Sequence, residues 1–134
     1  MFISRECDYA IRSLRALARG GYLSVNQICL KENIPQPYCY KILKKLEKAA
    51  LVSGKRGAGG GYRLIKPHDA VTLYDVYIAV EGTIYINECL REGYDCPNNP
   101  DGQGCAVHKA LNGLQEQLAG MLKQQSLAEI LASR

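Results

Sequence analysis

Apolar residues recur at intervals of three and four along most of the chain, a spacing typical of amphipathic helices. In the first such stretch Ala10, Leu14 and Leu17 share one face, while arginines occupy another. Ser24 and Thr72 each stand three residues before a Gln or Asp, which is the capping-box spacing at a helix start. The pattern therefore predicts helices over residues 4–19, 24–31, 37–50, 72–81 and 106–123, and a short last helix from residue 126.

Two short apolar segments in the middle of the chain, residues 51–53 and 62–65, predict strands. Between them lies a glycine-rich run, residues 54–61, which tolerates positive φ angles and close approach of another backbone. No Gly-Lys-Ser/Thr closes the run and no parallel βαβ unit surrounds it, so it is neither a P-loop nor a dinucleotide fingerprint. We expect a β-hairpin here.

The order of these elements is that of a winged helix-turn-helix domain, in which the third helix fits the DNA major groove and the hairpin lies on the backbone or in the minor groove. We predict a mainly α fold with a small β-hairpin wing. Residues 1–82 would form the winged helix-turn-helix DNA-binding domain, residues 83–105 a cysteine-rich loop, and residues 106–134 a long dimerisation helix and a C-terminal helix. The long helix carries an apolar seam that favours pairing with a second copy: Val107, Leu111, Leu114, Leu118 and Met121.

The distribution of charge supports a polyanionic partner. Residues 41–66 contain eight basic residues and one acid, whereas the whole chain carries only +4. The third helix places its lysines opposite its apolar face, and lysines at such a surface contact phosphates rather than base edges. These lysines are Lys41, Lys44, Lys45 and Lys48.

Length and composition exclude several classes of protein. A chain of 134 residues fits one compact domain or a domain with an added arm. Its apolar runs are all shorter than the roughly 18 residues a membrane span needs, and its start lacks signal-peptide order. The sequence shows no nucleophile–base pair or carboxylate dyad in a plausible pocket. We therefore expect a cytoplasmic protein that is not an enzyme and does not enter membranes.

The segment Ser53-Gly54-Lys55-Arg56-Gly57-Ala58-Gly59-Gly60-Gly61-Tyr62 resembles the wing of the IscR/NsrR group of bacterial iron–sulfur transcription regulators. The runs Asp8-Tyr9-Ala10-Ile11-Arg12 and Asp75-Val76 to Glu81-Gly82 are also similar to that family. The resemblance extends over nearly the whole chain and implies a dimer that binds double-stranded DNA through its third helix and wing. The contacts it implies are Gln36, Tyr38, Tyr40, Lys41 and Lys44 on the helix, and Arg56, Gly57, Gly59 and Gly60 in the wing.

Three cysteines and a histidine form a second cluster of candidate ligands: Cys89, Cys96, Cys105 and His108. Disulfides do not persist in a reducing compartment, so metal binding or thiol reactivity is the better explanation. The spacing lacks the tight C-x2-C pairs of zinc fingers, which favours an iron–sulfur cluster over structural zinc. By contrast, Cys29 and Cys39 fall on apolar helix faces and are expected to act as small hydrophobic residues, while Cys7 is less clear because it adjoins Asp8.

The resemblance implies that the three loop cysteines hold the cluster, although the gap between Cys96 and Cys105 is longer than is usual for the family. Two fourth ligands stay open. His108 stands where IscR-like members ligate a [2Fe–2S] cluster, and Asp8, contributed by the partner subunit, stands where NsrR-like members complete a [4Fe–4S] cluster. We slightly favour Asp8 and [4Fe–4S].

We therefore expect a transcription regulator, most simply a repressor, that senses redox state, nitric oxide or iron–sulfur status. One alternative is a regulator without a cluster that senses thiols or is controlled by a partner protein. Another is a metal-carrying redox protein with an incidental basic face. The visible absorption spectrum of protein purified without oxygen distinguishes the cluster-containing regulator from the first alternative. Sequence-selective binding to duplex DNA distinguishes it from the second.

Overall fold

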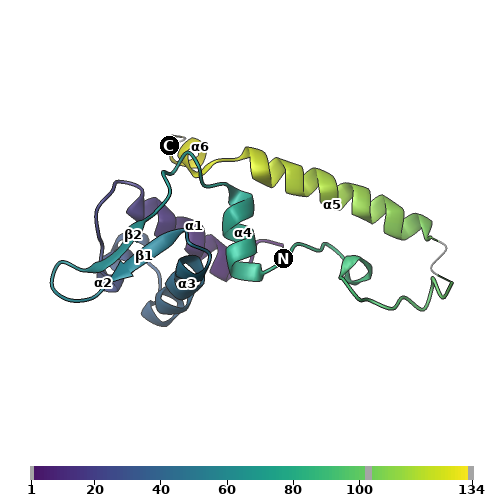
Figure 1. The fold of residues 1–134 in the computed structure, drawn as a ribbon, viewed down its shortest axis with the longest axis horizontal. Coiled ribbons are helices and arrows are strands. Elements are labelled where there is room, and N and C mark those ends of the chain that lie inside the picture. The colour runs from purple at the N-terminus through teal and green to yellow at the C-terminus, as the bar shows by residue number, and fades with distance from the viewer. Residues whose placement is uncertain (1, 102–103, 133–134) are drawn as a thin grey trace.

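The computed structural model describes residues 2–101 and 104–132. Over these residues the chain is mainly helical with one two-stranded hairpin, which confirms the predicted fold class (Figure 1). The elements are α1 (Arg5–Leu17), α2 (Val25–Glu32), α3 (Gln36–Lys48), β1 (Val52–Lys55), β2 (Gly61–Leu64), α4 (Leu73–Glu81), the 3-10 turn η1 (Glu88–Leu90), α5 (Ala106–Gln124) and α6 (Leu127–Ala132).

The helix starts form where the sequence places capping residues. Ser4 accepts a hydrogen bond from the Cys7 amide at 3.1 Å. Ser24 and Thr72 both complete full capping boxes, as the spacing predicted. Each cap satisfies amide groups that have no partner inside the first helical turn. These caps fix where α1, α2 and α4 begin and therefore which apolar faces turn inward.

The first four helices and the hairpin pack around one hydrophobic core. We call the unit that they form the head. α1 contacts α2, α3, α4, α6 and β2, so it is the element around which the others pack. Leu14 and Leu17 on α1 and Leu43 on α3 are fully buried. Burying side chains of this size contributes about 1.5–3 kcal/mol each relative to leaving them exposed.

The last helix also belongs to the head. After α5 the chain returns, and Leu127 of α6 is almost fully buried in the core. The Leu127 amide donates to the Val71 carbonyl at 2.8 Å, and the Leu73 amide donates to the Gln125 carbonyl at 2.9 Å. Within the described residues that follow the loop, α5 therefore lies outside the head and α6 packs into it.

An arm extends from the head and consists of α5 and the described part of the preceding loop, residues 83–101, which run side by side (Figure 1). The Ile86 amide donates to the side-chain oxygen of Gln115 on α5 at 2.9 Å. Leu122 is the buried anchor of α5 near the head. We expected most of residues 84–104 to be a loop, and within the described part the structure adds only the short turn η1.

The structure divides the predicted apolar seam of α5 into two rows. Leu111 and Leu118 are half-buried, whereas Val107, Leu114 and Met121 are 62%, 56% and 67% exposed. The exposed three are spaced seven residues apart, so they form a single stripe on one side of the helix. None of the helices in residues 2–101 and 104–132 combines the length and apolar character that a bilayer crossing needs.

Candidate functional sites

The start of α3 presents the side chains that we expect to read DNA. Pro35 and Pro37 flank the first residue of the helix, where proline's fixed φ suits a helix start. Tyr38 and Tyr40 are 42% and 51% exposed. Tyr38 packs edge-on against Tyr9 of α1, with ring centroids 5.6 Å apart, so its ring direction is restrained while its outer edge stays accessible.

Gln36 is also held in place. Its side-chain amide donates to the Asn26 side-chain oxygen on α2 at 2.8 Å, across the turn between the two helices. This bond ties the first residue of α3 to the first turn of α2. The exposed polar surface here is therefore pre-positioned rather than loose, which lowers the entropy lost when it binds a partner.

The four lysines of α3 do not share one environment. Lys44 and Lys48 are exposed, and Lys44 lies 3.7 Å from Glu47, a loose contact. Lys45, which we expected on the outer face, is only 34% exposed. Its ammonium lies 3.0 Å from a Glu6 carboxylate oxygen and donates to the Val80 carbonyl at 3.1 Å.

Glu6 was missed at the sequence level because it lies 35 residues before Lys41 and only the packing of α1 on α3 brings the two together. Its other carboxylate oxygen lies 2.8 Å from the Lys41 ammonium. Hydrogen bonds from Lys41 and then Lys45 lower the pKa of Glu6 below its ordinary value. The carboxylate therefore stays charged and bridges two lysines of α3.

The wing is a tight antiparallel hairpin whose register pairs Val52 with Leu64 and Lys55 with Gly61. It is fastened to the chain before α2 by two backbone bonds between Leu23 and Tyr62, at 2.9 and 2.8 Å. This close approach explains Gly61, which has a φ of +132° and whose added Cβ would lie 2.1 Å from the Leu23 carbonyl oxygen. A glycine is required there by space as well as by φ.

The other predicted wing glycines have different reasons. Gly57 and Gly59 take φ values of +94° and +73°, with open space around them among the described residues. A Cβ on Gly60 would lie 2.3 Å from the Lys55 carbonyl oxygen, so the loop closes on itself at that point. Arg56 at the tip is exposed. The backbone of the tip is therefore accessible to an anion, with a cation beside it.

Tyr22 supports the base of the wing, another role that the sequence did not suggest. The Lys55 ammonium and the Arg63 guanidinium each lie 5.6 Å from the centroid of its ring. Contacts of this kind hold a cation over the negative face of an aromatic ring. Two wing cations thus share one aromatic support from the segment before α2.

The three loop cysteines and His108 line one pocket of about 380 Å³ at the far end of the arm. All three thiols are free and half-buried, and the Asn87 amide lies 3.1 Å from the Cys89 sulfur. Among the described residues, however, no three His, Cys, Asp or Glu side chains stand close enough together to hold a metal ion. The donor types fit a soft metal centre, but the loop has to draw inward for them to share one.

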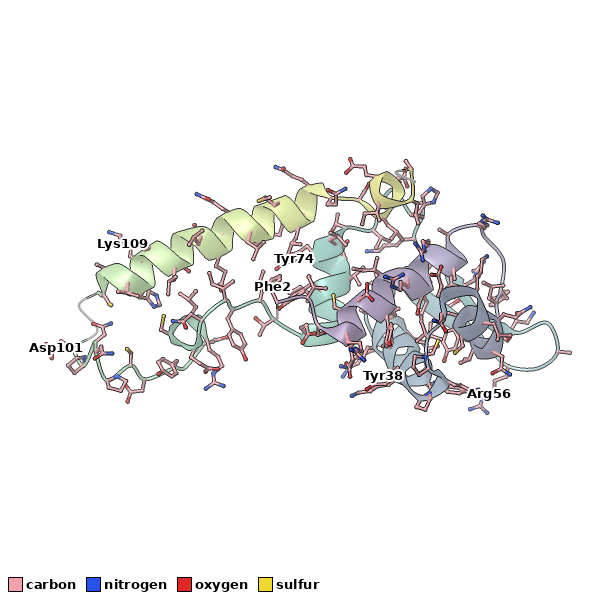
Figure 2. All side chains as sticks on the ribbon, turned by 180° about the vertical axis from the view of Figure 1, so that it is seen from behind. Phe2, Tyr38, Arg56, Tyr74, Asp101 and Lys109 are labelled. Carbon is pink, nitrogen blue, oxygen red and sulfur yellow. The ribbon has the colours of Figure 1, made fainter. Side chains whose placement is uncertain are left out.

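Asp8 lies elsewhere. It is on α1 in the head, is not among the described residues that line the pocket, and pairs with Arg12 at 3.0 Å. Figure 2 shows that the head and the far end of the arm lie apart. Tyr38 and Arg56 lie at the lower edge of the head, and Asp101 and Lys109 lie at the end of the arm. Asp8 can therefore meet the cysteine pocket only from a second subunit.

Cys29 and Cys39 pack in the head as expected, and Cys7, whose role the sequence left open, is buried as well. Cys39 is fully buried beside Cys29, and burial, followed by the hydrogen bond with Cys29, raises the pKa of its thiol to about 12. Cys7 is 1% exposed, and burial raises its pKa to about 11. Thiols with such pKa values carry little thiolate at neutral pH, so they react slowly.

Comparison with known proteins identifies relatives over nearly the whole chain. Residues 3–133 match the family model Rrf2, described as iron-dependent transcriptional regulator. The chain is 36% identical over 124 residues to Protein aau3 of Rhizobium meliloti, covering 90% of this chain and 80% of that protein. It is 29% identical over 134 residues to the transcriptional regulator IscR of Klebsiella pneumoniae, covering 98% and 80%.

Solved structures share the fold. CymR of B. subtilis, a global cysteine regulator, superposes with a TM-score of 0.76 at 23% identity, covering 100% of this chain and 98% of CymR. IscR of T. potens superposes with a TM-score of 0.74 at 21% identity, covering 98% and 87%. The relatives with named functions are transcription regulators rather than enzymes.

The wing glycines provide a test of the hairpin geometry. Gly61→Ala should lower the free energy of unfolding by roughly 3–5 kcal/mol, because it adds a clash with the Leu23 carbonyl to an unfavourable φ. Gly57→Ala, which has the φ penalty without a clash, should cost only about 1 kcal/mol. Urea unfolding measures both values, and equal losses would contradict the close approach at Gly61.

Proposed function

Because this chain belongs to the Rrf2 family of DNA-binding transcription regulators, we propose that it is a homodimeric repressor whose operator affinity is controlled by an iron–sulfur cluster. One observation carries the proposal. Exposed cations and the exposed tyrosines Tyr38 and Tyr40 gather on the head, while three cysteines and His108 line a single pocket at the end of the arm. Such a separation of a binding surface from a ligand pocket is what a sensor-regulator needs.

In this proposal the start of α3 enters the major groove and the wing lies against the backbone. Gln36, Tyr38 and Tyr40 contact base edges or the sugar–phosphate chain near them. Lys41, Lys44 and Lys48 contact phosphates. Arg56 enters the minor groove, where the amide groups of Gly57, Gly59 and Gly60 approach phosphates. Lys45 is not placed against DNA, since Glu6 and Val80 already accept hydrogen bonds from two of its three donors.

The dimer would form along the exposed row of α5. Val107, Leu114 and Met121 form an exposed apolar stripe about four helical turns long, and their spacing of seven suits a second copy of the same helix. Two heads joined in this way would meet half-sites roughly 34 Å apart on one face of DNA. A small change in the spacing of the heads then changes operator affinity.

Cys89, Cys96 and Cys105 would hold the cluster as thiolates, and an iron–sulfur centre in this position supplies sensitivity to oxidants and nitric oxide. The fourth ligand is Asp8 of the partner subunit, which we slightly prefer with a [4Fe–4S] cluster, or His108 with a [2Fe–2S] cluster. Asp8 must leave Arg12 to serve, a small cost because exposed ion pairs contribute only about 0–1 kcal/mol. Drawing the cysteines together would stiffen the arm that carries the dimer seam.

The DNA-binding surface is tested by substitution at the wing tip. Arg56→Ala should weaken binding to a selected operator by about 1–3 kcal/mol, because it removes a groove contact. Lys48→Ala should weaken binding to all duplexes alike and flatten the salt dependence. Fluorescence anisotropy at several salt concentrations measures both effects, and unchanged affinity in both variants would contradict this surface.

The dimer seam is tested on α5. Leu114→Glu should produce monomers and weaken operator binding, because it places a charge in the apolar stripe. Lys109→Gln, which changes the charge by the same amount at an exposed position outside the stripe, should remain dimeric. Sedimentation velocity measures the oligomeric state. A Leu114→Glu protein that is still dimeric with normal affinity would show that the seam is not an interface.

The cluster is tested by anaerobic iron and sulfide analysis together with absorption spectra. Cys89→Ala, Cys96→Ala and Cys105→Ala should each abolish the cluster, whereas Cys29→Ala, in the head, should retain it. Asp8→Ala should make a [4Fe–4S] cluster labile without unfolding the protein. If His108 ligates instead, His108→Ala should alter a red [2Fe–2S] spectrum that varies with pH.

Full iron and sulfide content in the triple cysteine variant would rule out both ligand sets. Wild-type protein that binds its operator but takes up no iron would favour the regulator without a cluster.

A further inference from the structure

One carboxylate on α1 faces two lysines of the helix that we place in the major groove. The two oxygens of Glu6 divide between them, with the Lys41 ammonium at 2.8 Å and the Lys45 ammonium at 3.0 Å. Lys41 and Lys45 are four residues apart, so they lie on the same side of α3 one turn from each other. Glu6 thus bridges consecutive turns of the recognition helix.

Lys41 and Lys45 differ in their other hydrogen bonds and in their exposure to solvent. Lys45 also donates to the Val80 carbonyl and is only 34% exposed, so its charge is used inside the head. Lys41 is 61% exposed and Glu6 is its ion-pair partner, yet it stands on the surface that faces DNA in the proposed complex. Its ammonium is therefore shared between an internal acid and an external phosphate.

The electrostatics of this sharing oppose DNA binding. A phosphate that approaches Lys41 has to compete with a carboxylate already in contact, and it meets the negative charge of Glu6 close behind the lysine. The side chain of Glu6 is 23% exposed, so water and salt screen it less than they screen a free surface acid. Lys44, at 69% exposure and 3.7 Å from its nearest acid, has no comparable constraint.

We propose that Glu6 is a positioning residue that acts through Lys41 and limits the electrostatic affinity of the recognition helix for DNA. It holds the ammonium against α1 and so weakens the phosphate contact that Lys41 makes in the complex. The proposal rests on the DNA-binding surface described above and adds to it a residue that lies outside the wing and the basic face. It also gives α1, which the head uses as its central helix, a direct effect on DNA binding.

The test is the salt dependence of duplex binding. Glu6→Gln keeps the shape and one acceptor oxygen but removes the charge, so the head should stay folded. The variant should bind both the selected operator and a scrambled duplex of equal length more tightly at low salt. The slope of log K against log[salt] should steepen by up to about 0.9, so the advantage should shrink roughly threefold between 50 and 200 mM salt.

Two further variants separate the lysine from general charge. Asp69→Asn removes an exposed acid from the turn before α4 and changes the net charge equally, so its slope should match that of wild type. In a Lys41→Gln background, Glu6→Gln should leave the slope unchanged, because the cation through which Glu6 acts is gone. Thermal unfolding of every variant checks the fold.

Each remaining outcome overturns the proposal in a recognisable way. Weaker binding by Glu6→Gln with an unchanged slope would make Glu6 a structural tie between α1 and α3. Equal steepening in Asp69→Asn would reduce the effect to net charge, and steepening that persists without Lys41 would place the action elsewhere. If wild-type protein binds neither duplex, the proposed function fails as well, whereas a failed slope test with normal wild-type binding overturns the role of Glu6 alone.

Discussion

The burial of the apolar face of α1 is the constraint on which the rest of the molecule depends. This one helix contacts α2, α3, α4, α6 and β2, and its residues Leu14 and Leu17 are inaccessible to water. Because a packed core deforms little, the angle of α1 sets the positions of α3 and the wing together. The N-terminal turn of α1 then becomes a natural place for charge to act on α3, as Glu6 does on Lys41 and Lys45.

The wing depends on a second constraint, which is main-chain pairing rather than side-chain packing. Leu23 and Tyr62 exchange two backbone bonds, and Gly61 exists to allow that approach. The arm is different again, because α5 has a single buried anchor at Leu122 and most residues between 83 and 101 are exposed. The molecule therefore joins a rigid head to an arm with fewer contacts, and regions with few buried contacts open and rearrange most readily. A cluster bound in the arm would therefore act on the part of the protein whose conformation changes most easily.

Local rules were sufficient for most of the fold. Capping residues, glycine and proline positions and the spacing of apolar residues act within a few residues of one another, so the predicted helices and hairpin were confirmed to within a few residues. The same rules did not predict the exposure of residues whose surroundings come from distant parts of the sequence. In the sequence Lys45 resembles the other lysines of α3, but hydrogen bonds to Glu6 and Val80 leave it only partly exposed. The sequence pattern of α5 predicts one apolar stripe, but contacts with the rest of the chain cover Leu111 and Leu118 in part and leave Val107, Leu114 and Met121 exposed.

The sequence by itself determined the class of fold, the basic helix α3, the glycine-rich hairpin and the set of soft donors in the loop. Each of these depends on residue type and short-range spacing. The tertiary structure decided that α6 packs into the head, that Glu6 bridges two lysines, and that three cysteines and His108 line one pocket while Asp8 of the same chain lies apart from it. These facts depend on contacts between segments tens of residues apart, and such contacts are set by how the helices pack as a whole rather than by any local preference.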